Sequence, residues 1–173
     1  MNSMTISEPL ATFRTAIAAN TEGDAPWRAL QALAQQTVGC KLFTVTTVDM
    51  DANLARRLYT NMPDAYPVSG TKPITVDPWF ELVVQGRRTF VANTLEEIAS
   101  HFPDWELIGS LGCGSCINLP VAIGGTVVGT VNMLDKEQHF TLERVALVDH
   151  LLMPAMTAFL AAGTSVSTSG GEA

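Results

Sequence analysis

The chain contains few basic residues, and charged or helix-breaking residues interrupt its apolar stretches. Ten lysines and arginines stand against 17 aspartates and glutamates, so the formal net charge is −7 at pH 7. A chain without a basic cluster is poorly suited to a phosphate backbone, so we expect no nucleic-acid partner. Proline, aspartate, histidine or glutamate interrupts each apolar stretch, so we also expect no membrane association through a spanning helix.

The N-terminus lacks the pattern of a secretory signal, and cysteine is scarce. The segment M-N-S-M-T-I-S-E-P has no basic region followed by an apolar core. The three cysteines of such a chain are free thiols by default, because the cytosol keeps thiols reduced. We therefore expect a cytoplasmic protein.

Common catalytic and metal-binding motifs are missing. The chain has no G-x-S-x-G, no phosphate-binding glycine loop and no H-E-x-x-H. Cys113 and Cys116 form C-x-x-C, but the motif enters a predicted strand, where no helix dipole lowers a thiol pKa. Zinc would need two more ligands, and Cys40 and the three histidines show no ligand spacing. We predict no metal site and no acid–base pair, and Cys113 and Cys116 remain the catalytic candidates only if the chain is a thiol enzyme.

The composition is that of one globular domain. The chain has 173 residues, of which 47% are hydrophobic and 16% charged. Such a chain can bury a single large core. We assign residues 1–162 to this domain. Residues 163–173 are small and polar, and we expect them to form a disordered tail.

Periodicity and turn signals place helices at both chain ends and strands between them. Pro154 lies inside the last helix, so we expect a kink near His150, whose carbonyl loses its partner. Strands with helices gathered at the chain ends predict an α+β fold with a largely antiparallel sheet. The expected helices cover 8–19, 24–38, 78–85, a segment from 94, a segment from 104, and 141–161; the expected strands cover 41–48, 54–60, 88–91, 115–123 and 126–134.

The last hairpin and the helix after it resemble the GAF domain family. The segment V-A-I-G-G-T-V-V-G-T-V-N-M-L followed by H-F-T-L-E-R is similar to the family's P-x-x-x-x-G-x-x-x-G hairpin and F-[ST]-x-x-[DE] helix start, with Arg144 where an acid is commoner. The resemblance covers about residues 8–161. It implies a central, mostly antiparallel sheet of five to six strands, with terminal helices on one face and short helices and loops over a pocket on the other. The matching positions are Pro120, Gly125, Gly129, Phe140 and Thr141.

The two faces of this hairpin differ in chemistry, because side chains alternate along a strand. One face is aliphatic and should meet the terminal helices, and we expect helices 8–19 and 141–161 to pack side by side on it. The other mixes a thiol, amides and a hydroxyl. The aliphatic set is Ile117, Leu119, Val121, Val127, Val131 and Met133; the polar set is Cys116, Asn118, Thr130 and Asn132.

Two registers are open to the hairpin. A three-residue loop at 123–125 with a bulge puts Cys116 opposite Asn132, and Asn118 opposite Thr130. A two-residue turn would instead set Asn132 among aliphatic side chains. An unpaired buried amide costs about 1–3 kcal/mol, so we favour the three-residue loop.

Aromatic residues are concentrated in the segments that should cover the polar face. These segments are residues 61–86 and 94–112, and we call them the lid. An aromatic lid over a polar sheet face forms a mainly apolar pocket with a few polar anchors. The alternative is that the aromatic residues are core and the asparagines merely bond neighbouring loops. The candidate ligand-binding residues are Trp79, Phe80, Trp105, Cys116, Asn118, Thr130 and Asn132.

The resemblance implies a small-molecule-binding sensory domain rather than an enzyme. Its partners would be a small ligand and a second copy bound through helices 8–19 and 141–161. Known branches of the family bind cyclic nucleotides, bilins or haem. The chain lacks the N-K-F-D-E pattern of the cyclic-nucleotide branch and a recognisable bilin attachment cysteine, while His101 and His150 are the lone candidates for a haem ligand. The sequence names neither ligand nor cofactor.

Two alternatives stay open. The first is a thiol-dependent reductase of a small oxidised metabolite, similar to the free methionine sulfoxide reductases of the family. The cysteine of that branch precedes the helix at 78–85, where this chain reads G-T-K-P-I-T-V-D-P-W-F, and its acidic pocket positions fall on Cys116, Asn132 and Leu134. The second is a structural dimer with a vestigial pocket.

Overall fold

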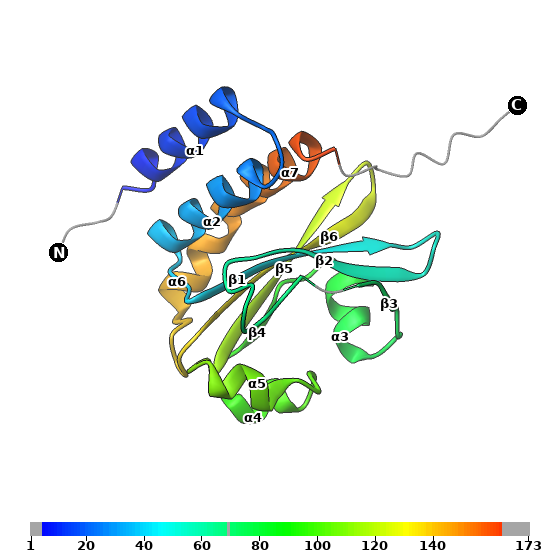
Figure 1. Cartoon of the computed structure of the whole chain (residues 1–173). Coiled ribbons are helices and arrows are strands. Elements are labelled where there is room, and N and C mark those ends of the chain that lie inside the picture. Colours follow the sequence, from blue (N-terminus) through cyan, green and yellow to red (C-terminus); the bar gives the residue numbers. More distant parts are fainter. Residues whose placement is uncertain (1–4, 69, 164–173) are drawn as a thin grey trace, which may run out of the picture.

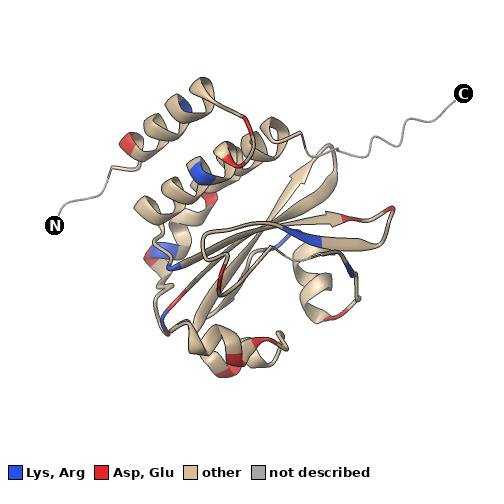
Figure 2. Ribbon diagram, viewed as in Figure 1, with Lys and Arg blue, Asp and Glu red and all other residues tan. Residues whose placement is uncertain are grey.

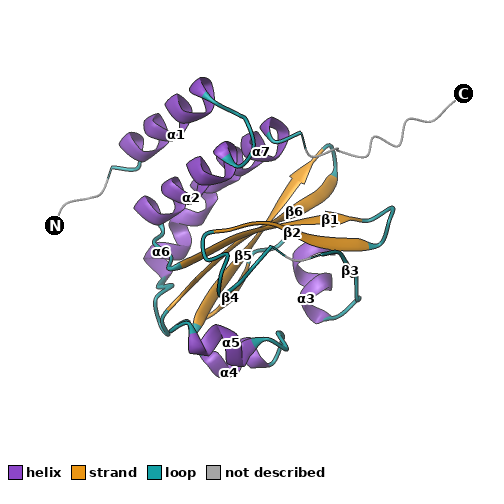
Figure 3. Cartoon of the chain, viewed as in Figure 1, coloured by secondary structure: helices purple, strands orange, loops and turns teal. Residues whose placement is uncertain are grey.

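The computed structural model describes residues 5–68 and 70–163, and its centre is a six-stranded antiparallel sheet (Figures 1 and 3). The strand order is β3-β2-β1-β6-β5-β4. The predicted α+β class is confirmed. Only β3 was not anticipated, because it lies in a segment whose prolines and glycine predict a loop. The strands are β1 Leu42–Asp49, β2 Leu54–Thr60, β3 Lys72–Pro73, β4 Phe90–Ala92, β5 Ser115–Ile123 and β6 Thr126–Asp135.

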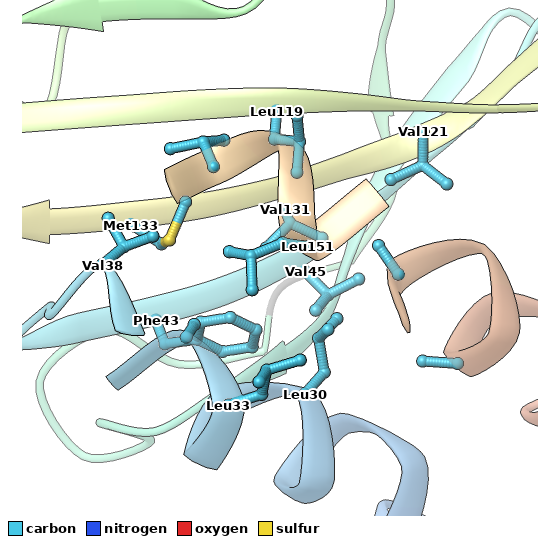
Figure 4. Packing of buried hydrophobic residues seen from close by; sticks show 14 of the residues in the cluster. Leu30, Leu33, Val38, Phe43, Val45, Leu119, Val121, Val131, Met133 and Leu151 are labelled. Carbon is cyan, nitrogen blue, oxygen red and sulfur yellow. The ribbon is translucent and has the colours of Figure 1, made fainter. Parts of the chain in front are cut away.

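Helices from both chain ends cover one face of the sheet. They are α1 Ser7–Ala19, α2 Ala25–Thr37, α6 Leu142–Leu147, the 3-10 turn η2 Val148–Leu151, and α7 Leu152–Ala161. Leu30 and Leu33 of α2 pack against Phe43 and Val45 of β1 in the main core (Figure 4).

The expectation that helices 8–19 and 141–161 lie side by side on the sheet is wrong for the first helix. The helix α2 takes that place beside α7, and α1 lies outside them (Figure 1). The physical reason is the amount of apolar surface. In α1 only Phe13 is buried, whereas α2 buries six residues.

The terminal helix has the break that its proline predicts. The turn η2 ends at Leu151, three residues before Pro154. The N-cap was also predicted correctly, since the Thr141 side chain accepts a hydrogen bond from the Arg144 amide. By length and composition alone, Leu142–Ala161 could cross a membrane, contrary to our expectation for the apolar stretches. In the fold its inner side is packed in the core, where Phe159 is 0% exposed.

Short helices lie over the other face of the sheet. They are α3 Pro78–Phe80, continued by the π-helical turn η1 Glu81–Gln85, then α4 Leu95–Ala99 and α5 Trp105–Ser110. Asp77 caps α3 by accepting a hydrogen bond from the Phe80 amide at 2.8 Å. Thr94 and Glu97 form a capping box at α4. These caps fix the ends of segments too short to be stable alone.

The register of the β5–β6 hairpin differs from the one that we favoured. Gly124 and Gly125 form a two-residue turn with φ of 60° and 86°, and a bulge follows, between the pairs Val121–Gly129 and Ala122–Val127. Asn118 therefore pairs with Asn132, rather than with Thr130.

The bulge restores the faces that we expected for the asparagines, because the extra residue shifts the alternation by one. It also changes the membership of the aliphatic face. Val128, rather than Val127, joins the main core, while Val127 packs beneath Phe80 with Val48 and Val84 on the lid side.

We predict that Gly129→Ala destabilises the fold by about 1–3 kcal/mol, the usual cost of overpacking. A Cβ atom there would collide with the Thr46 carbonyl oxygen and lie 2.6 Å from Cζ of Phe159. Urea unfolding followed by circular dichroism measures this change. Gly70→Ala is the control, because nothing lies within 4 Å of its added carbon. Equal midpoints for the two variants would contradict the prediction.

Candidate functional site

A cavity of about 380 Å³ lies between the sheet and the lid. Its sheet side is formed by polar side chains of three adjacent strands, and we call these the cavity floor. The floor consists of Thr44 and Thr46 of β1, Cys116 and Asn118 of β5, and Thr130 and Asn132 of β6.

The structure brings five of the seven candidate ligand-binding residues together at this cavity. The two it leaves out are Phe80 and Trp105. Successive helical residues point in different directions, so Trp79 faces the cavity while Phe80 is buried beside Val84. Trp105 begins α5 and is 36% exposed. The five that line the cavity are Trp79, Cys116, Asn118, Thr130 and Asn132.

A chain of hydrogen bonds crosses the cavity floor and reaches the lid. Trp79 Nε1 donates to Asn118 Oδ1 at 2.9 Å, and Asn118 Nδ2 donates to Asn132 Oδ1 at 2.8 Å. Asn132 Nδ2 then donates to the hydroxyls of Thr44, at 3.1 Å, and Thr46, at 3.3 Å. An indole nitrogen can only donate, so Trp79 fixes the orientation of both amides. The asparagines thus join strand to strand and sheet to lid. The alternative was that they bond only neighbouring loops, and these hydrogen bonds reach further than that.

Sequence reasoning missed the part of the cavity that lies outside the lid and the hairpin, namely Thr44, Thr46 and Arg57. The two threonines alternate with Phe43 and Val45 along β1, so their common face could have been found. Their place beside Asn132 depends on the pairing of β1 with β6, which no local signal reports.

Arg57 and Tyr66 close one side of the cavity. The Arg57 guanidinium carbon lies 3.8 Å from the centre of the Tyr66 ring, and its Nη1 donates to the Pro67 carbonyl at 2.7 Å. The Tyr66 hydroxyl donates to Asp104 Oδ2 at 2.5 Å. Burial and this hydrogen bond raise the pKa of Tyr66 well above its usual range. The contact joins the two segments of the lid.

The thiols are poorly placed for nucleophilic chemistry. Burial raises the pKa of Cys116 to about 12, and that of Cys40 to about 12 as well. Burial also raises the pKa of Cys113, which is not among the cavity-lining residues. In the part of the chain that the structure describes, all three cysteines are free, and no group of three or more His, Cys, Asp and Glu side chains is placed to hold a metal ion.

The two histidines considered as haem ligands lie in different places. His101 lines the cavity and packs edge-on against Phe90, with ring centroids 4.9 Å apart. His150 is exposed in η2, in the helical layer on the other side of the sheet. The two cannot share one ligand.

The raised thiol pKa values predict a loss of stability at alkaline pH. An unfolded cysteine ionises near pH 9, whereas folded Cys116 and Cys40 hold their protons to about pH 12. The unfolded state therefore binds fewer protons between these values, and the free energy of unfolding falls as pH rises through that window. Urea unfolding from pH 8 to pH 11 tests this, with the Cys40→Ser, Cys116→Ser double variant as the control expected to lose less. A parent and variant that change equally would contradict it.

Comparisons with known proteins agree with the geometry. The family model described as "GAF domain" matches residues 20–159. The search of curated proteins found no match. Among solved structures, the fold is similar to the GAF domain of a two-component sensor histidine kinase from Bacillus halodurans, at 13% identity and a TM-score of 0.65, covering 80% of this chain and 94% of that one.

Two further structures of the same fold are informative about the range of the family. One is a phycoerythrobilin-bound GAF domain from a cyanobacterial phytochrome, at 11% identity and a TM-score of 0.63, covering 90% of this chain and 96% of that one. The other is a free methionine-R-sulfoxide reductase from Neisseria meningitidis in complex with its substrate, at 14% identity and a TM-score of 0.60, covering 93% of this chain and 92% of that one.

Proposed function

The chain belongs to the GAF domain family, and from this we propose that it is a non-catalytic sensor, which binds a small organic molecule in the cavity and signals through its terminal helices. The observation that carries the proposal is the hydrogen-bond chain from Trp79 to the cavity floor. It links a side chain of the lid to the sheet, so a molecule that contacts either partner acts on both. The three free cysteines fit action in the reducing cytoplasm.

The size and lining of the cavity support small-molecule binding. Ligand pockets usually measure about 300–1,000 Å³ and combine apolar walls with a few polar anchors. This cavity of about 380 Å³ has aromatic and aliphatic walls, formed by residues such as Phe102 and Ile108, above a polar floor. It suits a compact molecule better than a large tetrapyrrole.

The reductase alternative has less support. The similarity to the Neisseria meningitidis enzyme, at 14% identity, shows the fold alone. Among the residues that the structure describes, Cys116 is the one cysteine that lines the cavity, and a thiol with a pKa of about 12 is almost fully protonated at neutral pH. A protonated thiol is a weak nucleophile.

We predict that Asn118→Leu weakens ligand binding by about 1–3 kcal/mol, because it removes the acceptor for Trp79 and the donor to Asn132. Native mass spectrometry of freshly purified parent would identify a retained molecule, and calorimetry with that molecule would compare the variants. Thr126→Leu, exposed at the far end of the same hairpin, is the control. Equal affinities for both variants would contradict the proposal that the cavity floor contacts the ligand.

The outer helical surface supports a homodimer as the output of the sensor. An apolar groove runs between α1 and α7, lined by residues that include Leu10, Ile17 and Met153. Met153 is 69% exposed and Leu160 58% exposed. A second copy that covered these side chains would remove apolar surface from water, and a two-fold axis would use the same patch twice.

We predict that Met153→Glu combined with Leu160→Glu converts a dimer into a monomer, because it places charge in the apolar contact. Sedimentation velocity at tens of micromolar measures the change. Val76→Glu is the matched control, since Val76 is 63% exposed on the lid side of the sheet. A parent that sediments as a monomer would remove the dimer from the proposal while leaving ligand binding in place.

A further inference from the structure

We infer that the ligand of the cavity is a small carboxylic acid, held by Arg57 through its carboxylate and by the lid aromatic residues through an apolar body. This inference rests on the proposed function of the cavity and narrows it to one class of molecule. Three features carry it: a cation with an unpaired donor, floor hydroxyls whose protons are free to donate, and lining acids that already have partners.

Arg57 is the cation with the unpaired donor. Its side chain makes one hydrogen bond in the described structure, from Nη1 to the Pro67 carbonyl, and its buried Nε–H has no acceptor. Among the described residues no carboxylate lies within 4.0 Å of its guanidinium nitrogens. A planar guanidinium has five N–H groups in a fork that fits the two oxygens of a carboxylate. A small turn of this side chain toward the cavity would satisfy the unpaired donor with such a group.

The cavity floor has hydroxyl protons to offer to a ligand. Each asparagine oxygen accepts a hydrogen bond, that of Asn118 from Trp79 and that of Asn132 from Asn118. The Thr44 and Thr46 hydroxyls already accept from Asn132, so their own protons are available to donate. Because Trp79 fixes the direction of the chain, these two hydroxyl protons stay available for the acceptor oxygens of a ligand, such as those of a carboxylate.

The acids of the lining are already engaged. Asp77 accepts the hydrogen bond that caps α3, and Asp104 accepts one from the Tyr66 hydroxyl. Lys72 is a second cation of the lining, and it also lacks an ion partner within 4.0 Å among the residues described. Figure 2 shows that the neighbouring helices α4 and α5 carry only acidic charges, so the positive charge that an anion needs comes from β2 and β3.

The walls fix the rest of the ligand. Tyr66, Trp79 and Phe102 present ring surfaces, and Leu134 and Ile108 complete an apolar enclosure. An aromatic or branched aliphatic body fits this lining. The class is therefore a compact acid with one carboxylate and a small apolar body, which suits a pocket at the small end of the usual range.

The test compares matched pairs of probes. Aromatic and branched aliphatic acids, such as phenylacetate and 4-methylpentanoate, are screened beside their primary amides, which keep the shape and remove the charge. Thermal shift identifies binders, and calorimetry gives dissociation constants. We expect acids to bind at least about tenfold more tightly than their amides, because a hydrogen bond to a charged group is the stronger kind.

The Arg57→Met variant tests whether Arg57 causes the preference for acids over amides. Methionine keeps an unbranched chain against the Tyr66 ring and removes the charge. We expect the acid-to-amide ratio to fall to within about threefold of unity. Arg56→Met is the matched control, because Arg56 is exposed on the same strand and is not among the lining residues, and its ratio should equal that of the parent. Should Arg57→Met fail to fold, Arg57→Lys keeps the charge without the planar fork and should give an intermediate ratio.

Each result bears on the proposal. Amides that bind as tightly as acids, or a preference that Arg57→Met leaves unchanged, would overturn the carboxylate assignment and leave the cavity as a binding site for neutral molecules. Phenyl phosphate binding more tightly than every acid would overturn it as well. If no pair binds and the purified protein retains no molecule, the proposed sensing function fails together with this inference.

Discussion

One extra residue in the β5–β6 hairpin decides which side chains meet the helices and which line the cavity. The two-residue turn at Gly124 and Gly125 would by itself send Asn132 toward the helices. The bulge that follows shifts the alternation, so Asn118 and Asn132 pair on the lid side. Without the bulge Asn132 would lie in the aliphatic core, and its strand neighbours Val131 and Met133 would face the cavity, so both layers of the domain depend on this bulge.

The same strands contact the terminal helices on one face of the sheet and form the cavity floor on the other. Thr46 shows this directly. Its hydroxyl accepts a hydrogen bond from Asn132 in the cavity floor, while its carbonyl lies beside Gly129, where the Phe159 ring of α7 also packs. The close approach at Gly129 leaves no space for a side chain. A ligand that shifts Thr46 would therefore also shift the backbone beside Gly129, against which α7 packs, and α7 is one of the helices that we propose as the output.

The sequence predicted the features that depend on near neighbours. The Thr141 cap, the break before Pro154 and the alternation of β5 each follow from residues a few positions apart. It predicted a bulge but could not place it, because no side chain in G-G-T-V-V-G distinguishes a bulge at Val128 after a two-residue turn from a bulge at a three-residue loop. It also missed Arg57 and the threonines of β1, because their role follows from strands that meet across the sheet. Trp79 faces the cavity and the adjacent Phe80 does not, because successive helical residues point in different directions, and composition does not reveal which of the two faces inward.

The central pairing of β1 with β6 also has a consequence for the order in which the molecule is built. Asn132 and Thr44, which bond directly, are separated by 88 positions along the chain. Contacts of such long range form slowly, since chain entropy is lost before they are made. During synthesis the lid leaves the ribosome before β6, so a nascent chain has its aromatic residues but not the floor that they cover. Binding competence is thus acquired late, when the domain is almost complete, and a ligand can stabilise only a chain that has finished folding.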